Sequence, residues 1–234
     1  NEGAEGVERN LYLSLLDASG AGAAGYEGWP LPTYPTNAWP HGALVQVPAA
    51  FYLPGSLPSS AYRLVAGLVD PQTGEKTPPV ELATLTVQQR AASFTRPSPT
   101  HPLAGAPQIG THARLLGYDL VRTADGRRLI TLYWEVLQPL LPPHHIFVHL
   151  DAADGTTVAQ HDAPPMTADG PAPTGSWQPG EFLATVHTLP APPSGSEGGA
   201  GYTIRVGLYN PQTQVRLPVT VRGEAAGDSV EVGG

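Results

Sequence analysis

Two stretches of the chain, 140 residues apart, carry the same strand-and-turn pattern. Tyr62–Thr73 reads YRLVAGLVDPQT, and Tyr202–Thr213 reads YTIRVGLYNPQT. In both, alternate residues are apolar ahead of a Pro-Gln-Thr turn, which is the period-two pattern of a half-buried β-strand. Asp or Asn in front of the proline favours a turn, because its side chain binds the backbone two residues on. The chain therefore contains one strand-and-turn pattern twice.

The repeat extends upstream of both stretches. Segment 35–42 shares Pro-Thr, Trp and Gly with segment 173–180 at the same spacing. Further upstream, segment 12–20 (YLSLLDASG) parallels segment 147–155 (FVHLDAADG), and both end in an Asp-to-Gly hairpin turn. Three matches in the same order indicate two related units.

The second unit has additional strands at its front. Segment 114–120 (RLLGYDL) and segment 129–136 (LITLYWEV) have no counterpart in the first unit. In the latter, one set of alternating residues is wholly apolar, as expected of a strand with one buried face: Ile130, Leu132, Trp134 and Val136. The first unit therefore lacks its N-terminal strands, or it completes its sheet with strands from elsewhere.

Composition supports an all-β chain. Of 234 residues, 27 are Gly and 27 are Pro, and both types penalise helix interiors. Short strands separated by turns indicate two tandem antiparallel β-sandwich units, Ig-like or jelly-roll-like, of which the first lacks its N-terminal strands. We expect unit 1 at residues 1–92, a stiff Pro-rich linker at 93–108, unit 2 at 109–222 and a flexible tail at 223–234.

Several functional classes are disfavoured by composition. The net charge is −8, without a basic run, so we expect no nucleic-acid partner. The chain has no cysteine, which excludes disulfides and thiolate zinc sites. We find no apolar run long enough for a membrane span, and the first residues, NEGAEGVERN, lack the pattern of a signal peptide.

The second unit resembles a known module. The segments that carry the resemblance are LITLYWEVLQPL (129–140), HHIFVHLDAADGTTVAQHDAPP (144–165), PTGSWQPGE (173–181) and GYTIRVGLYNPQT (201–213). They are similar to a repeated β-sandwich module of bacterial membrane proteins, found in the extracytoplasmic C-terminal region of Chloroflexi-type proteins that resemble family 39 glycosyltransferases. The resemblance covers Gly110–Val219 and, for the latter part of the module, Leu11–Val87.

This resemblance implies a non-catalytic, extracytoplasmic accessory module of a membrane-bound protein, with a glycan or the membrane-embedded part of the same protein as its partner. Two alternatives stay open at this point. One is a carbohydrate-binding module, and the other is a structural cell-surface spacer or oligomerisation domain. The incomplete first unit also predicts self-association, because an unpaired sheet edge invites pairing. A membrane-attached or secreted location is expected in each case.

Aromatic side chains give the best candidate for ligand contact. Tyr26, Trp29 and Tyr34 lie close together among glycines and prolines, and the second unit lacks them. Flat rings on a stiff loop can stack on the apolar faces of sugar rings. Trp39 belongs to the same loop, but its repeat partner Trp177 indicates a structural role. The alternative for the other three is that they cover the core or an interface.

No catalytic, metal or cofactor site is predicted. Histidines gather at His144, His145, His149 and His161, but each has an ordinary loop or sheet interpretation. Asp151, Asp154 and Gly155 resemble half of a calcium loop, without the alternating acids and the terminal Glu. No G-x-S-x-G elbow or P-loop is present. Paired carboxylates on separate strands are the one catalytic arrangement that sequence leaves open.

Overall fold

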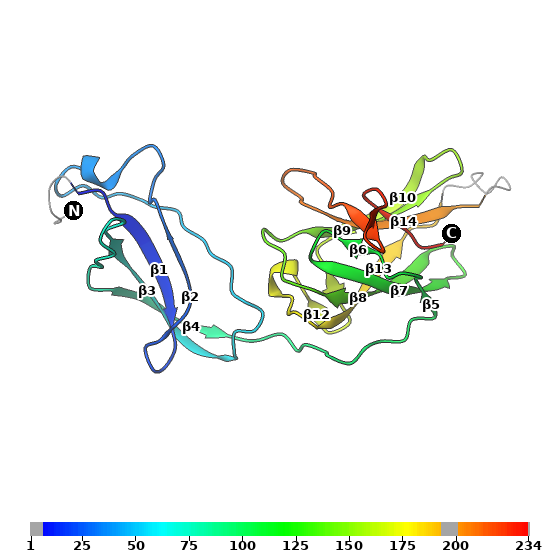
Figure 1. Cartoon of the computed structure of the whole chain (residues 1–234), viewed down its shortest axis with the longest axis horizontal. Coiled ribbons are helices and arrows are strands. Elements are labelled where there is room, and N and C mark those ends of the chain that lie inside the picture. The colour runs from blue at the N-terminus through cyan, green and yellow to red at the C-terminus, as the bar shows by residue number, and fades with distance from the viewer. Residues whose placement is uncertain (1–6, 193–200, 234) are drawn as a thin grey trace. The chain divides into compact units, whose positions relative to one another are not determined.

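The computed structural model describes residues 7–192 and 201–233 and divides the chain into two compact units, Asn1–Gln89 and Arg90–Gly234 (Figure 1). The all-β prediction is confirmed. Within the described ranges every extended element pairs antiparallel, and the only helices are two short 3-10 turns, η1 (Thr36–Ala38) and η2 (Thr174–Ser176).

Unit 1 contains one four-stranded antiparallel sheet in the order β2-β1-β3-β4. The strands are β1 (Asn10–Leu16), β2 (Gly22–Gly28), β3 (Ser60–Val69) and β4 (Val80–Val87). Its small core forms around Leu15, Leu57 and Tyr62. The 31 residues between β2 and β3, numbered 29–59, form no strand and include only η1.

Unit 2 is a β-sandwich of two sheets. One sheet has the order β10-β9-β14-β17, and the other has the order β13-β8-β7-β6-β15-β16, with β5 also paired to β7. A separate small ribbon pairs β11 with β12. The bounds are β5 (His101–Pro102), β6 (Gln108–Ile109), β7 (Ala113–Arg122), β8 (Arg128–Val136), β9 (His145–Asp151), β10 (Thr157–Ala163), β11 (Met166–Thr167), β12 (Gly170–Pro171), β13 (Phe182–Leu189), β14 (Thr203–Tyr209), β15 (Val219–Val221), β16 (Glu224–Ala225) and β17 (Val230–Glu231).

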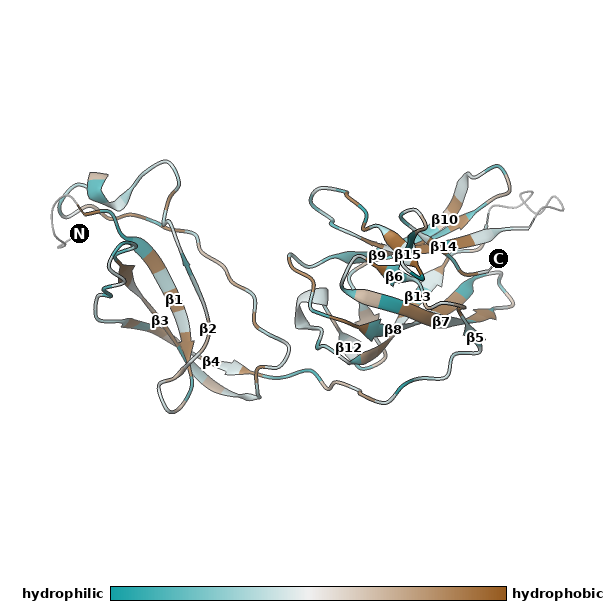
Figure 2. Cartoon of the chain, viewed as in Figure 1, coloured by the Kyte–Doolittle hydropathy of each residue, from teal (hydrophilic) through white to brown (hydrophobic). Residues whose placement is uncertain are grey.

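Alternating side chains of both sheets fill the core of unit 2, and Figure 2 shows the corresponding hydrophobic bands along its strands. The apolar set predicted for 129–136 is buried as expected, with Trp134 and Leu132 at 0% exposure. From the facing sheet, Val148 and Val206 are also at 0%. Close packing of two inner faces is what holds a sandwich together.

Three neighbouring strands recur in the two units: the order β2-β1-β3 of unit 1 corresponds to β10-β9-β14 of unit 2. The fourth strand differs, because β4 (Val80–Val87) corresponds by position to the β15–β16 segment, which belongs to the other sheet of unit 2, while β14 pairs with β17 instead. Tyr12 pairs with Gly67 in unit 1, as Phe147 pairs with Gly207 in unit 2. In each case the aromatic ring lies against the glycine, where a Cβ atom would collide with it.

A cation covers each of these rings. Lys76 Nζ lies 4.8 Å from the ring centroid of Tyr12, and the Arg216 guanidinium lies 4.2 Å from that of Phe147. Lys76 and Arg216 occupy the same place after the repeated turn, where their backbones bridge to Val69 and Tyr209. The shared glycine, aromatic and cationic positions therefore build one packing motif twice.

The turns of the repeat also match bond for bond. Asp70 Oδ1 accepts from the Gln72 N–H at 2.8 Å, and Asn210 Oδ1 accepts from the Gln212 N–H at 2.9 Å. This is the side-chain-to-backbone bond expected from the Pro-Gln-Thr pattern. The predicted hairpin turns that end at Gly20 and Gly155 are present as well, with φ of 87° and 82°.

Two expectations about connecting segments need correction. Segment 93–108, expected to be an unfolded linker, contributes β5 and part of β6 to unit 2, because its backbone pairs with β7 despite its prolines. The tail 223–234, expected to be flexible, contributes β16 and β17, and Val232 is 1% exposed in the core. Isolated apolar residues in a small, acidic tail are enough to dock it when a sheet edge lies open beside it.

Candidate functional site

The aromatic residues predicted to contact a ligand do not form one loop. Trp29 is 56% exposed and Tyr34 is 36% exposed, both in the segment after β2. Tyr26, by contrast, lies within β2 and pairs with Leu13 of β1, so its assignment to the loop is wrong. Its ring lies across Gly28, whose missing side chain makes room for it. The small Gly and Ala residues around Tyr26 give β2 no alternation of large apolar and polar residues, so the sequence pattern did not predict this strand.

Tyr34 also has a structural role through its backbone. Its carbonyl accepts a hydrogen bond from Trp39 Nε1 at 3.1 Å. The repeat partner of that bond runs from Trp177 Nε1 to the carbonyl of Ala172, at 2.8 Å. The rings of Tyr34 and Trp39 are 6.4 Å apart and tilted by 46°, so they present no single flat platform. The most exposed ring of this segment is the indole of Trp29.

The four histidines that lie close together in the sequence do not gather at one site, and each makes a local contact. His144 Nδ1 lies 2.7 Å from the carbonyl of Pro142, and His145 makes an edge contact with the ring of Tyr209. His149 Nε2 lies 3.0 Å from Asp162 Oδ1. Over residues 7–192 and 201–233, His, Asp and Glu side chains form no group of three that could hold a metal ion.

His161 takes part in a buried polar chain that sequence analysis missed. Its Nδ1 lies 3.1 Å from Nδ1 of His187 on β13, and His187 Nε2 lies 3.0 Å from Thr185 Oγ1. Trp134 Nε1 donates to the same hydroxyl at 2.9 Å. Since the indole only donates, the Thr185 hydroxyl is free to donate to His187, which in turn directs its Nδ1–H to His161.

This arrangement keeps His187 neutral. Burial, and secondarily the charge of His161, lowers the pKa of His187 from 6.5 to about 3. The side chain is 3% exposed, so a proton taken up there would have no water to solvate it. These hydrogen bonds link β10 of one sheet with β13 and β8 of the other, so they serve packing within the sandwich.

A buried ion pair lies where the chain enters unit 2. Glu181, at 0% exposure, accepts from Arg90 Nη2 at 2.8 Å and from the backbone N–H of Gln178 at 3.0 Å. Arg90 also reaches the carbonyl of Ser176. A cavity of about 230 Å³ opens beside this pair. All oxygens of Glu181 are used in holding the segment, so its carboxylate is a structural group.

Asp151 and Asp154, which resemble half of a calcium loop in the sequence, make local contacts. Asp154 Oδ1 accepts from the Thr156 N–H at 2.9 Å, which holds the pKa of Asp154 below its usual range. Asp151 is 5% exposed, accepts from Thr157 Oγ1 at 2.7 Å and pairs with Arg205. Asp154 is thus used by the hairpin turn, and Asp151 is used by the same hairpin and by its ion pair with Arg205 of β14.

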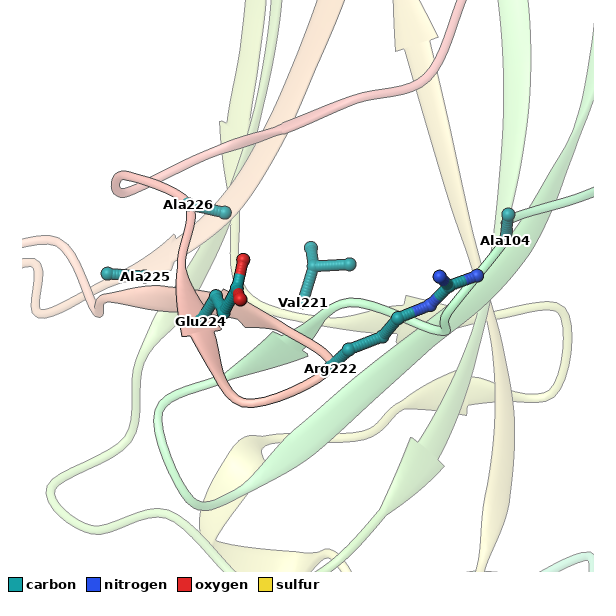
Figure 3. A pocket seen from close by; sticks show the side chains of 6 residues that line it. All are labelled: Ala104, Val221, Arg222, Glu224, Ala225 and Ala226. Carbon is teal, nitrogen blue, oxygen red and sulfur yellow. The ribbon is translucent and has the colours of Figure 1, made fainter.

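A surface cavity of about 510 Å³ lies between the β15–β16 hairpin and Ala104 (Figure 3). Val221 and two alanines, Ala225 and Ala226, form its apolar walls, while Arg222 extends toward Ala104 and Glu224 lies on the opposite side. This lining offers one cation and one anion but no nucleophile. No residue of this cavity was predicted, because its walls join the segment expected to be a linker, the end of unit 2 and the segment expected to be a tail.

Sequence did carry a signal for the histidine chain. In β13 the inward positions read Leu183, Thr185, His187 and Leu189, so two polar residues occur where alternation predicts apolar ones. A polar residue at a core position indicates a hydrogen-bonded network. The partners Trp134 and His161 lie on other strands, and only the tertiary structure joins them.

Comparisons with known proteins give little guidance. No family model matches the chain, and no curated protein matches it. One similar solved structure is an exo-chitosanase of Amycolatopsis orientalis in complex with PNP-β-D-glucosamine, with 14% identity, a TM-score of 0.28, and coverage of 94% of this chain and 24% of that chain. A likeness this weak carries no argument about activity. Among the described residues, none of the helices has the length and hydropathy that crossing a membrane requires.

Proposed function

We propose that the chain is a non-catalytic accessory module, carried outside the cytoplasm by a membrane-bound protein. The observation that carries this is the use of the repeated side chains. Glycine, aromatic ring, cation and Trp–carbonyl bond recur in both units as packing contacts, so the positions that the duplication kept alike are occupied in holding strands together. Such a scaffold suits support or presentation, and we infer a glycosyltransferase as its carrier.

Cell fractionation tests this location. An antibody against the 234 residues should detect the protein in the membrane fraction of cells that make it. Protease added to intact cells should remove the antigen, while a cytoplasmic marker stays intact. Recovery of the antigen in the cytosolic fraction, protected from external protease, would contradict the proposal.

A second candidate, carbohydrate binding, is favoured by one observation. Trp29 exposes 56% of its surface on a segment rich in Gly and Pro, where an indole is available to stack on a sugar. A glycan array should then give a signal that Trp29→Ala removes. Phe94→Ala is the matched control, because Phe94 is an equally exposed aromatic residue of unit 2, at 59%. A signal lost in both variants, or absent from the intact chain, would contradict carbohydrate binding at Trp29.

A further inference from the structure

Unit 2 has a cavity of about 230 Å³ on the outer face of the sheet that contains β8 and β13. Ala184 of β13 pairs with Tyr133 of β8, and both residues line the cavity. The next pair along these strands, Thr185 and Leu132, is fully buried on the core side, so Ala184 and Tyr133 point outward. Because Ala184 contributes only a methyl group, the space beside Tyr133 is left unfilled.

Segment 90–97 forms one wall of the cavity, and two contacts anchor it. Arg90, at its start, forms the ion pair with the fully buried Glu181. Further along, the Ser93 carbonyl accepts a hydrogen bond from the Phe182 N–H at 2.8 Å. This wall is therefore fixed by contacts within unit 2 itself.

Tyr133 forms an aromatic wall that is also held in place. Its hydroxyl donates to Asp119 Oδ2 at 2.6 Å, and the other oxygen of the same carboxylate accepts from the Thr100 N–H at 2.6 Å. Asp119 thus ties the ring of Tyr133 to the chain that follows the first wall. A ring already fixed in position loses little conformational entropy when a ligand packs on it.

The β11–β12 ribbon forms the third wall and carries an acid. Thr167 Oγ1 donates to the Gly170 carbonyl at 3.0 Å, which closes the turn that contains Asp169. Asp169 is exposed, lines the cavity and forms no ion pair in the described part of the chain. Its carboxylate is therefore placed to accept hydrogen bonds from a ligand.

Arg90 adds a donor without an acceptor. Its two Nη atoms bind Glu181 and the carbonyls of Ala91 and Ser176. Its Nε is buried and has no hydrogen-bond partner among the described residues. A buried N–H group without an acceptor costs free energy, and in native proteins such groups are nearly always satisfied. Since Arg90 lines the cavity, an oxygen atom bound there is the acceptor that suits it.

Charge and size restrict what the cavity can hold. Glu181 already neutralises Arg90, so the remaining charge of the lining is that of Asp169, which repels an anion. The described residues contain no group of three acids or histidines that could hold a metal ion. The volume lies below the roughly 300–1,000 Å³ of pockets for drug-sized ligands, so the ligand is small.

The lining combines aromatic rings with hydroxyl groups. An aromatic ring suits a ligand with an apolar C–H face, and hydroxyl groups suit one with several hydroxyls of its own. A sugar ring has both features. The residues concerned are Tyr133, Phe182, Ser93, Thr95 and Thr167.

We propose that this cavity binds a single neutral pyranose ring. The C–H face of the sugar packs on Tyr133, its hydroxyls donate to Asp169, and one of its oxygens accepts from Arg90 Nε. The site belongs to unit 2 and is separate from Trp29. This inference does not depend on the proposed function.

A titration followed by NMR tests the site. The ¹⁵N-labelled 234-residue chain is titrated with methyl β-D-glucopyranoside, methyl β-D-galactopyranoside and methyl α-D-mannopyranoside. We expect at least one of them to give saturable shifts at the amides of 91–97 and 167–169, with a Kd of about 1 mM, the strength that a ligand of this size reaches. Trp29→Ala should leave these shifts unchanged.

Two substitutions locate the binding. Ala184→Leu fills the cavity from an outward position and should abolish binding, whereas Val186→Leu, two residues along the same strand and 41% exposed, is the matched control. Asp169→Ala should weaken binding about tenfold, as expected when hydrogen bonds to a charged group are lost, and Glu224→Ala should not. The amide spectrum of each variant also shows whether unit 2 is folded.

Three results would overturn the proposal. One is the lack of a saturable shift with all three glycosides. Another is binding that persists in a folded Ala184→Leu variant. The third is saturable binding of choline without binding of a glycoside, because an acid beside aromatic rings also suits a quaternary ammonium group.

Discussion

Unit 1 and unit 2 contain the same three neighbouring strands, β2-β1-β3 and β10-β9-β14, in different surroundings. Both sheets are fixed by the same turn and the same aromatic-on-glycine contact. In unit 2 the other sheet covers the apolar face, and the core runs through 22 buried residues, whereas the core cluster of unit 1 has three. The difference teaches that the repeat encodes a sheet, while the covering strands decide whether that sheet becomes a stable sandwich.

The largest expected difference concerns the paired tryptophans. Trp177→Ala should lower the free energy of unfolding of unit 2 by about 3–5 kcal/mol, because it empties a fully buried site. Trp39→Ala should cost unit 1 only about 1 kcal/mol, since its indole is half-buried. Denaturant unfolding, with hydrogen exchange to assign each transition to a unit, measures both. Equal costs would mean that Trp39 is already covered in solution.

The next effect is a pH dependence confined to unit 2. Because the pKa of His187 is lowered from 6.5 to about 3, the unfolded chain binds a proton there that the folded unit does not. Stability is therefore full above pH 6.5 and falls by roughly 1.4 kcal/mol per unit as the pH drops toward 3.

His187→Gln removes this group and should flatten the pH profile of unit 2 between pH 6.5 and 5. The exposed His41→Gln, in unit 1, serves as the control and should leave that profile intact. Unfolding free energies measured at half-unit steps decide the matter. An unchanged slope in His187→Gln would show that His187 is not the titrating group.

The shared glycines should respond unequally to the same change. A methyl group at Gly207 would overlap the buried Phe147 ring and approach the Asp228 carbonyl to 3.0 Å, so Gly207→Ala should cost about 1–3 kcal/mol. At Gly67 the three atoms nearest to the methyl all belong to Tyr12, at 2.6 Å, and Tyr12 is 5% exposed against 1% for Phe147. Gly67→Ala should cost less than Gly207→Ala in urea unfolding. The reverse order would mean that the Tyr12 ring is the more tightly held.

The smallest effect comes from one turn position. Gly74 and Gln214 are repeat partners, and both have positive φ, at 75° and 60°. Gln214→Gly should stabilise unit 2 by up to about 1 kcal/mol, because it removes the left-handed strain of a side chain. Gly74→Gln should destabilise unit 1 by a similar amount, although its side chain would enter open space. Thermal unfolding of the two variants should move in opposite directions.

Sequence was sufficient where the signal is local. The alternation in 129–136 and 202–208 identified core strands, and the Pro-Gln-Thr turns and Trp pair were placed correctly. It failed at Tyr26, where small residues hide a strand, and in 93–108 and 223–234. There, short strands exist only because another strand lies beside them, and no local pattern records that neighbour.

The candidate sites divide in the same way. The exposed aromatic Trp29 could be suspected from its Gly- and Pro-rich surroundings. The cavity between Ala104 and the β15–β16 hairpin, the Arg90–Glu181 pair and the chain from Trp134 to His161 each join residues from distant strands. The sequence contains all of these residues, but it does not show that they lie close together in the fold.

The amino-acid sequence by itself determined the duplication, the strands and the turns, since these depend on periodicity and on the backbone preferences of Gly, Pro, Asp and Asn within a few residues. Only the tertiary structure decided that one copy is a closed sandwich and the other an open sheet. Burial depends on which strands meet across the core, and that pairing is a property of the folded chain as a whole.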